Sequence, residues 1–105
     1  MILTGKAKED FVEWCKQDAD WLQTYEDIFL YALIIEWFDS VGIYVECNRA
    51  TLGIDFKCWY YTISDSRGVH LNNYLYNIVK VDSRHEATKQ AIIKANELYN
   101  ENNPK

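Results

Sequence analysis

The sequence predicts an α+β fold in the order α-α-β-β-β-α, with a three-stranded antiparallel meander packed against helices. Residues 28–38 are apolar except for Glu36. Residues 43–61 alternate between apolar and polar positions, which is typical of half-buried strands. A helix-capping sequence at Ser83 then begins a periodic stretch. The chain has 105 residues, so we expect one domain over residues 1–105.

The first helix is predicted over about residues 5–16. Phe11 and Cys15 recur at helical spacing, and acidic residues such as Glu13 occupy the other side. The stretch 17–20 is polar, which leaves open whether the helix continues or turns there.

The second helix contains the apolar residues 28–38. Thr24 is predicted to cap it, with Asp27 at its third position, and it is predicted to end near Ser40 with Gly42 in the left-handed turn beyond. The run is shorter than the roughly 20 residues of a bilayer span. Because its apolar residues lie all round the helix, we expect several sides to be covered.

Two strands are predicted around a turn at residues 48–53. Pairing Cys47 with Ile54 produces one apolar face. Its members are Ile43, Val45, Cys47, Ile54, Phe56, Cys58 and Tyr60. A polar loop over residues 64–73 follows, and a third strand is predicted over about residues 74–79.

In this register three aromatic residues point away from the apolar face, namely Tyr44, Trp59 and Tyr61. An exposed aromatic patch is a candidate partner surface. The alternative is that the first helix or a second copy of the chain covers it. A third interpretation, intermediate between these two, is a homodimer formed through this face or through residues 28–38.

The last helix begins at a capping box formed by Ser83 and Glu86. Its core stripe comprises Ala87, Ala91, Ile92, Ala95, Leu98 and Tyr99. The polar tail over residues 100–105 is expected to fray.

Catalytic, cofactor-binding and metal-binding residues are not expected. The sequence has three widely spaced cysteines, two histidines and four glycines, without a CxxC pair or a phosphate-binding glycine loop. We therefore predict that the protein is not an enzyme. The odd cysteine count indicates free thiols in a reducing compartment, and no secretory signal precedes Asp10. A cytoplasmic location is expected.

The charge is unevenly distributed. The formal net charge is −5, and residues 1–40 hold nine acids against three lysines. Two interpretations remain: a solvated face that aids solubility, or a site for a basic partner. An acidic surface repels phosphate, so nucleic acid is not expected as a partner.

Without the first helix, residues 24–99 have the element order of double-stranded-RNA-binding domains, and the likeness is one of order. The Lys-Lys-x-Ala-Lys pattern of that family falls on residues 84–88. There Arg84 and Ala87 fit, whereas His85 and Thr88 replace lysines. We therefore do not infer RNA binding for this chain from the shared element order. The alternative function, nucleic-acid binding, would use three basic residues, Arg84, Lys89 and Lys94.

The chain also resembles a group of small proteins from Bacteroides-type gut bacteria and their prophage or mobile elements. Three blocks carry the resemblance, TGKAKEDF at residues 4–11, WFDSVGIYVE at residues 37–46, and residues 83–100. The resemblance implies a bacterial or mobile-element setting for this protein but no mechanism, since the group has no known activity. We predict a non-catalytic intracellular domain for protein interaction or self-association, as an accessory protein of a mobile element, without a membrane partner.

Overall fold

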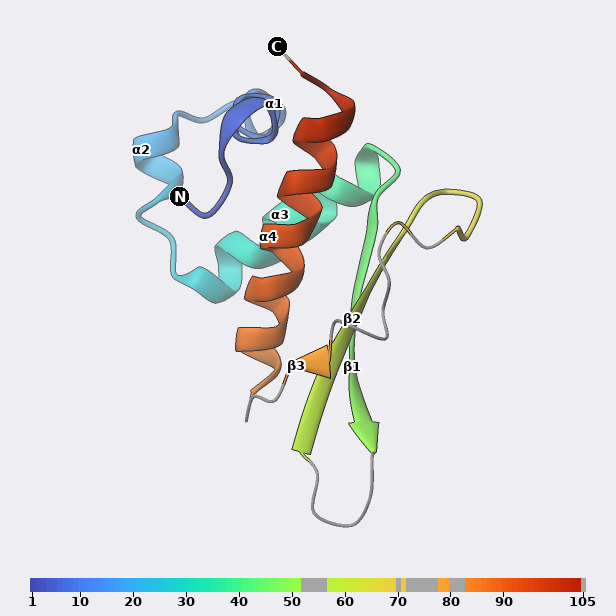
Figure 1. The fold of residues 1–105 in the computed structure, drawn as a ribbon. Helices are drawn as coiled ribbons and strands as arrows, with labels where there is room; N and C mark the ends of the chain where they lie inside the picture. The colour runs from blue at the N-terminus through green and yellow to red at the C-terminus, as the bar shows by residue number, and fades with distance from the viewer. Residues whose placement is uncertain (52–56, 70, 72–77, 80–82, 105) are drawn as a thin grey trace.

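The computed structural model describes residues 1–51, 57–69, 71, 78–79 and 83–104. Helices and an antiparallel hairpin are both present, so the α+β class is confirmed. The helices lie on one side of the hairpin (Figure 1). The elements in chain order are α1 (Gly5–Cys15), α2 (Ala19–Leu22), α3 (Asp27–Ser40), β1 (Tyr44–Thr51), β2 (Lys57–Ser64), β3 (Ile78–Val79) and α4 (Arg84–Asn102).

The polar stretch after α1 is a turn. Lys16 adopts a left-handed conformation (φ 56°), and its N–H donates to the carbonyls of Val12 and Glu13. Asp18 then caps α2, because its Oδ1 accepts a hydrogen bond from the Trp21 N–H at 2.9 Å. The two helices are therefore separate.

Helix α3 begins without the predicted threonine cap. The Thr24 hydroxyl donates to the carbonyl of Trp21 at 2.6 Å, at the end of α2, and Glu26 occupies the cap position without a side-chain bond. The predicted cap is wrong because the Thr24 hydroxyl is bonded to the end of the preceding short helix and not to the start of α3. The predicted end is confirmed: α3 ends at Ser40, and Gly42 follows at φ 81°.

The hairpin forms, but in a different register. Cys47 pairs with Tyr61, and Val45 pairs with Ile63. The predicted partner of Cys47 was Ile54, seven positions earlier on the second strand. Because side chains alternate between the two faces, a slip by an odd number of residues exchanges the faces of β2. The predicted pairing is therefore wrong, and residues 52–56 lie outside the described part.

Only part of the predicted third strand is described. Ile78 and Val79 form β3, which pairs antiparallel with Tyr60 and Trp59 of β2. The rest of the predicted strand, residues 74–77, lies outside the described residues.

The core is centred on Trp37 of α3, which is 2% exposed. Its ring contacts three other aromatic rings, with centroids at 4.8 Å from Phe38, 4.9 Å from Tyr99 and 5.9 Å from Phe11. Ile63 of β2 is fully buried in the same cluster. Helices α1, α3 and α4 and the hairpin therefore share one interior.

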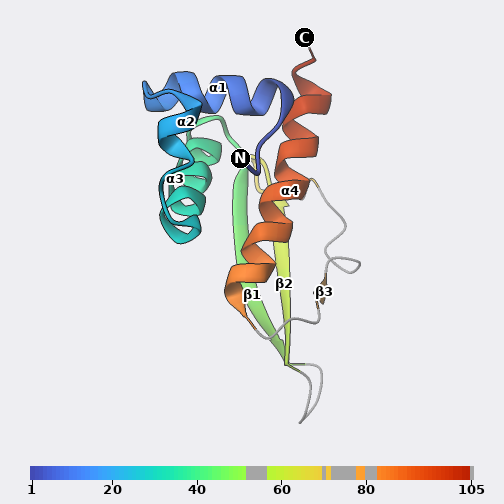
Figure 2. The same ribbon diagram turned by 90° about the vertical axis from the view of Figure 1, so that its left-hand side faces the viewer.

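Asparagine side chains of α4 bind the start of α1. The Thr4 N–H donates to Oδ1 of Asn96 at 2.9 Å, and the Ala7 N–H donates to Oδ1 of Asn100 at 2.8 Å. Figure 2 shows the start of α1 beside the C-terminal half of α4. These hydrogen bonds satisfy backbone N–H groups that a helix start leaves open. Helix α4 continues to Asn102, so residues 100–102 of the tail are helical.

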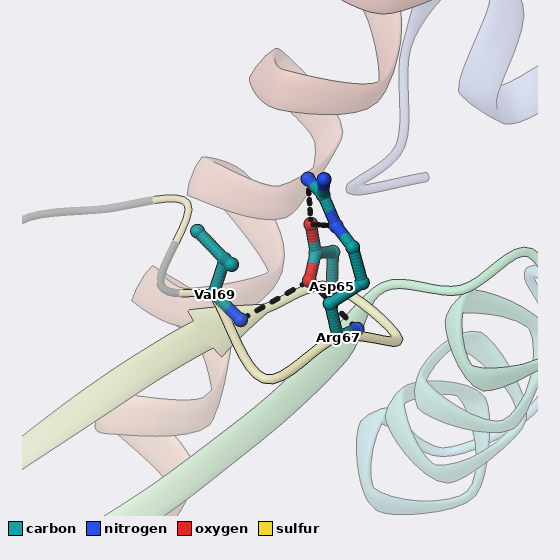
Figure 3. Close-up of polar contacts among 3 residues, drawn as sticks. All are labelled: Asp65, Arg67 and Val69. Carbon is teal, nitrogen blue, oxygen red and sulfur yellow. Dashed lines mark hydrogen bonds and ion pairs between the residues drawn. The ribbon is translucent and has the colours of Figure 1, made fainter.

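A compact loop follows β2 (Figure 3). The Asp65 carboxylate accepts hydrogen bonds from the backbone N–H groups of Arg67 (2.9 Å) and Val69 (3.1 Å), and from the Arg67 guanidinium at 2.8 Å. The hydrogen bonds from Arg67 lower the pKa of Asp65. The Val69 side chain is 49% exposed, so this loop presents an apolar residue away from the core.

No helix in the described ranges is long and apolar enough to cross a bilayer.

Candidate functional site

Helix α3 has one buried side and one open side. The buried side consists of Leu30, Tyr31, Ile34, Trp37 and Phe38. On the other side, Ile28 is 66% exposed and Phe29 is 63% exposed. The expectation that several sides of this helix are covered is therefore wrong for the side that holds Ile28 and Phe29. We call this side the open face of α3 and define it by the exposed residues Ile28, Phe29, Ala32 and Glu36 and by the half-buried Ile35 at its border.

A cavity of about 280 Å³ lies between the open face and the first turns of α4. We call it the α3–α4 groove. It is lined by Ile28, Tyr31, Ala32 and Ile35 of α3 and by Arg84, His85 and Thr88 of α4. Most of this lining is apolar, and such concave apolar surfaces are typical of ligand or partner sites.

Ring contacts hold the two walls of the groove together. The rings of Tyr31 and His85 stack, with centroids 5.2 Å apart and planes 19° apart. His85 Nε2 lies 3.9 Å from Oδ2 of Asp27 at the start of α3. Arg84 places its guanidinium 5.0 Å from the centroid of Trp59 on β2. The beginning of α4 is thereby fixed against both α3 and the hairpin.

The groove environment favours neutral side chains. Burial raises the pKa of the Tyr31 phenol, and the nearby charges of Asp27 and Glu86 raise it further. Behind Thr88, whose hydroxyl lies 3.7 Å from the Cys47 sulfur, burial raises the pKa of the Cys47 thiol. A raised thiol pKa means less thiolate, and the thiolate is the nucleophilic form.

Burial likewise raises the pKa of Cys15 on α1. Both Cys15 and Cys47 are free thiols, and the Cys58 side chain lies outside the described part. Across the described residues, no group of three His, Cys, Asp or Glu side chains is placed to hold a metal ion.

The three aromatic residues of the predicted partner surface do not lie together. Tyr44 is 38% exposed on the side of the hairpin away from the helices, whereas Tyr61 is buried against the helices. Trp59 shares the side of Tyr61 and lies beneath Arg84. The predicted patch is wrong because the register slip exchanged the faces of β2.

The three predicted nucleic-acid contacts lie on different sides of α4. Arg84, Lys89 and Lys94 are spaced by five residues, which turns a helix by about 140° at each step. Lys94 Nζ lies 3.4 Å from Oε2 of Glu97, and Arg84 is stacked on Trp59. This arrangement does not form the continuous basic stripe that tracks a phosphate backbone.

The groove was not predicted from the sequence, although one signal was present. Ile28, Ala32 and Ile35 follow each other at intervals of four and three residues, which places them in one row along a helix. A buried helix has the same spacing, so the pattern alone does not distinguish an open row from a covered one.

Comparisons with protein-family models, curated proteins and solved structures find no match to this chain. The open face of α3 and the α3–α4 groove are therefore the features on which a function is proposed.

Proposed function

We propose that this protein is a non-catalytic protein-interaction domain that binds a partner on the open face of α3 and in the α3–α4 groove. The observation that carries the proposal is the exposure of Ile28 and Phe29, adjacent large apolar residues beside an apolar cavity. Full burial of such a side chain contributes about 1.5–3 kcal/mol. A partner that covers both residues therefore gains substantial binding free energy.

The setting is part of the same proposal. Free thiols at Cys15 and Cys47 fit a reducing, cytoplasmic compartment. The resemblance in residues 4–11, 37–46 and 83–100 supports an accessory role in a mobile element. The full three-stranded antiparallel meander serves as the frame that holds α3 and α4.

The surface charge supports a protein partner over a nucleic acid. The net charge is −5, and the basic residues of α4 do not lie on one side of that helix. Affinity for a phosphate backbone comes from clustered lysine and arginine side chains, which this arrangement does not provide.

A comparative co-purification from the source organism tests the proposal. The intact chain serves as bait in three forms: wild type, Phe29→Ser, and Val69→Ser as a matched control at another exposed apolar residue. We expect a protein that the wild type and Val69→Ser retain in stoichiometric amount, and that Phe29→Ser loses. Retention of the same proteins by all three forms would contradict the proposal.

A further inference from the structure

We infer that the occupant of the open face is an amphipathic helix of another protein, with an apolar stripe flanked by lysine or arginine. This inference rests on the proposed function and names the chemistry of the partner. It follows from the shape of the open face and from the charges around it.

The shape fits a helix. Ile28, Ala32 and Ile35 form a straight row along α3, and the α3–α4 groove runs beside that row. Helices bind such grooves with residues spaced by three and four positions, which matches the spacing of the row itself. The backbone of α3 is hydrogen-bonded within the helix, so it offers no open edge for an added strand.

The charges of α3 are all negative. Its charged residues are Asp27, Glu36 and Asp39, and none is basic. Within the described residues, no base forms an ion pair with Glu36 or Asp39. Glu36 and Asp39 are three residues apart on α3, so they are neighbours on the helix surface. Burial, and then the negative charge of Glu36, raise the pKa of Asp39.

The basic side chains of the groove, His85 and Arg84, lie at its other end and already have contacts. His85 faces Asp27 at 3.9 Å, and Arg84 lies over Trp59 at 5.0 Å. The end of the open face at Glu36 therefore keeps an uncompensated negative charge. Lysine or arginine on a bound helix would neutralise it, and charge complementarity of this kind gives specificity.

The same charges argue against a second copy of this chain. In a twofold pair of α3 helices, Glu36 and Asp39 find no basic residue on the other α3. Arg84 and His85, at the Asp27 end of that helix, already contact Trp59 and Asp27. Like charges brought together in an interface are unfavourable. A partner with basic flanks avoids this repulsion.

Binding of two labelled synthetic helices, followed by fluorescence anisotropy with the full chain, tests the inference. Both helices have about eighteen residues and the same leucine stripe, and their flanks carry lysine in one and glutamate in the other. We expect the lysine helix to bind at least about tenfold more tightly, with an affinity that falls as salt rises.

Protein variants locate the binding. Phe29→Ser should weaken binding of the lysine helix about tenfold, whereas Val69→Ser should leave it unchanged. The pair Glu36→Gln and Asp39→Asn should weaken it several-fold. The matched pair Glu46→Gln and Glu101→Gln removes the same charge from exposed residues elsewhere and should change Kd by less than about twofold. Unchanged circular dichroism spectra establish that the variants are folded.

Four results would overturn the inference. The glutamate helix could bind as tightly as the lysine helix, or the two charge-neutralised pairs could weaken binding equally. Sedimentation equilibrium could also show a wild-type dimer that Phe29→Ser dissociates, which would make a second copy the occupant. Absence of binding by both helices also overturns it, while the co-purification experiment decides the proposed function separately.

Discussion

The hydrogen bond between Tyr99 and Asp10 joins α4 to α1, and its loss should destabilise the fold measurably. Tyr99 Oη donates to Oδ2 of Asp10 at 2.5 Å, and Lys6 Nζ lies 3.1 Å from Oδ1. A hydrogen bond to a charged group contributes about 1.5–3 kcal/mol. Because the Asp10 side chain is 25% exposed and water replaces part of the bond, we expect about 1.5 kcal/mol for Tyr99→Phe.

The same bond gives the stability a defined pH dependence. Burial, followed by the bond to Asp10, raises the pKa of Tyr99 to about 12 from an ordinary value of 10.0. Its contribution is therefore complete below pH 10 and is lost as the pH rises toward 12. The bond from Tyr99 lowers the pKa of Asp10 below 3.8, so that contribution is present above pH 3.8 and is lost at lower pH.

Urea and thermal unfolding followed by circular dichroism measure the effect. At neutral pH, Tyr99→Phe should lower Tm by about 6–9 °C. Tyr44→Phe is the matched control, because Tyr44 is 38% exposed and should tolerate the change. A double-mutant cycle with Asp10→Asn should give a coupling free energy of about 1 kcal/mol or more. Equal effects of the two tyrosine variants, or absorbance titration in which every tyrosine ionises near pH 10, would refute the reasoning.

Three further predictions concern stability, each measured by urea unfolding. Asn96→Ala removes two hydrogen bonds with Thr4, at 2.9 and 3.0 Å, and should cost about 1–3 kcal/mol; a loss under about 0.5 kcal/mol would contradict this. Ser83→Ala removes the cap bond to the third residue of α4 and should cost about 1 kcal/mol, while Ser83→Asp should retain most of the stability. Phe29→Ser should change the free energy of unfolding by less than about 0.5 kcal/mol, whereas Phe38→Ala should cost about 3–5 kcal/mol; similar losses would mean that Phe29 is part of the core.

Local signals were read correctly where a few neighbouring residues decide the structure. The Ser83 side chain accepts the hydrogen bond from the Glu86 N–H, as its position predicts. The reciprocal bond is absent, because the Glu86 carboxylate accepts from the Gln90 amide instead. Gly42 takes the left-handed turn after α3, since it has no Cβ to clash there.

The register of the hairpin was misread because both sides of β2 are apolar or aromatic. The predicted strand stopped at Tyr61, which left out Ile63. Including Ile63 would have favoured the observed register, where Ile63 pairs with Val45. In the observed register Tyr61 lies in the core, so the predicted aromatic surface does not form.

The sequence by itself determined the elements: capping residues, periodic apolar positions and glycine turns act over a few residues, and they specify where helices and the hairpin form. Tertiary structure alone decided which apolar residues are left uncovered. Ile34 and Ile28 are equally apolar, yet Ile34 is buried and Ile28 is 66% exposed. The reason is that α4 and β1 pack on one side of α3, and the position of those neighbours depends on contacts between residues distant in the chain.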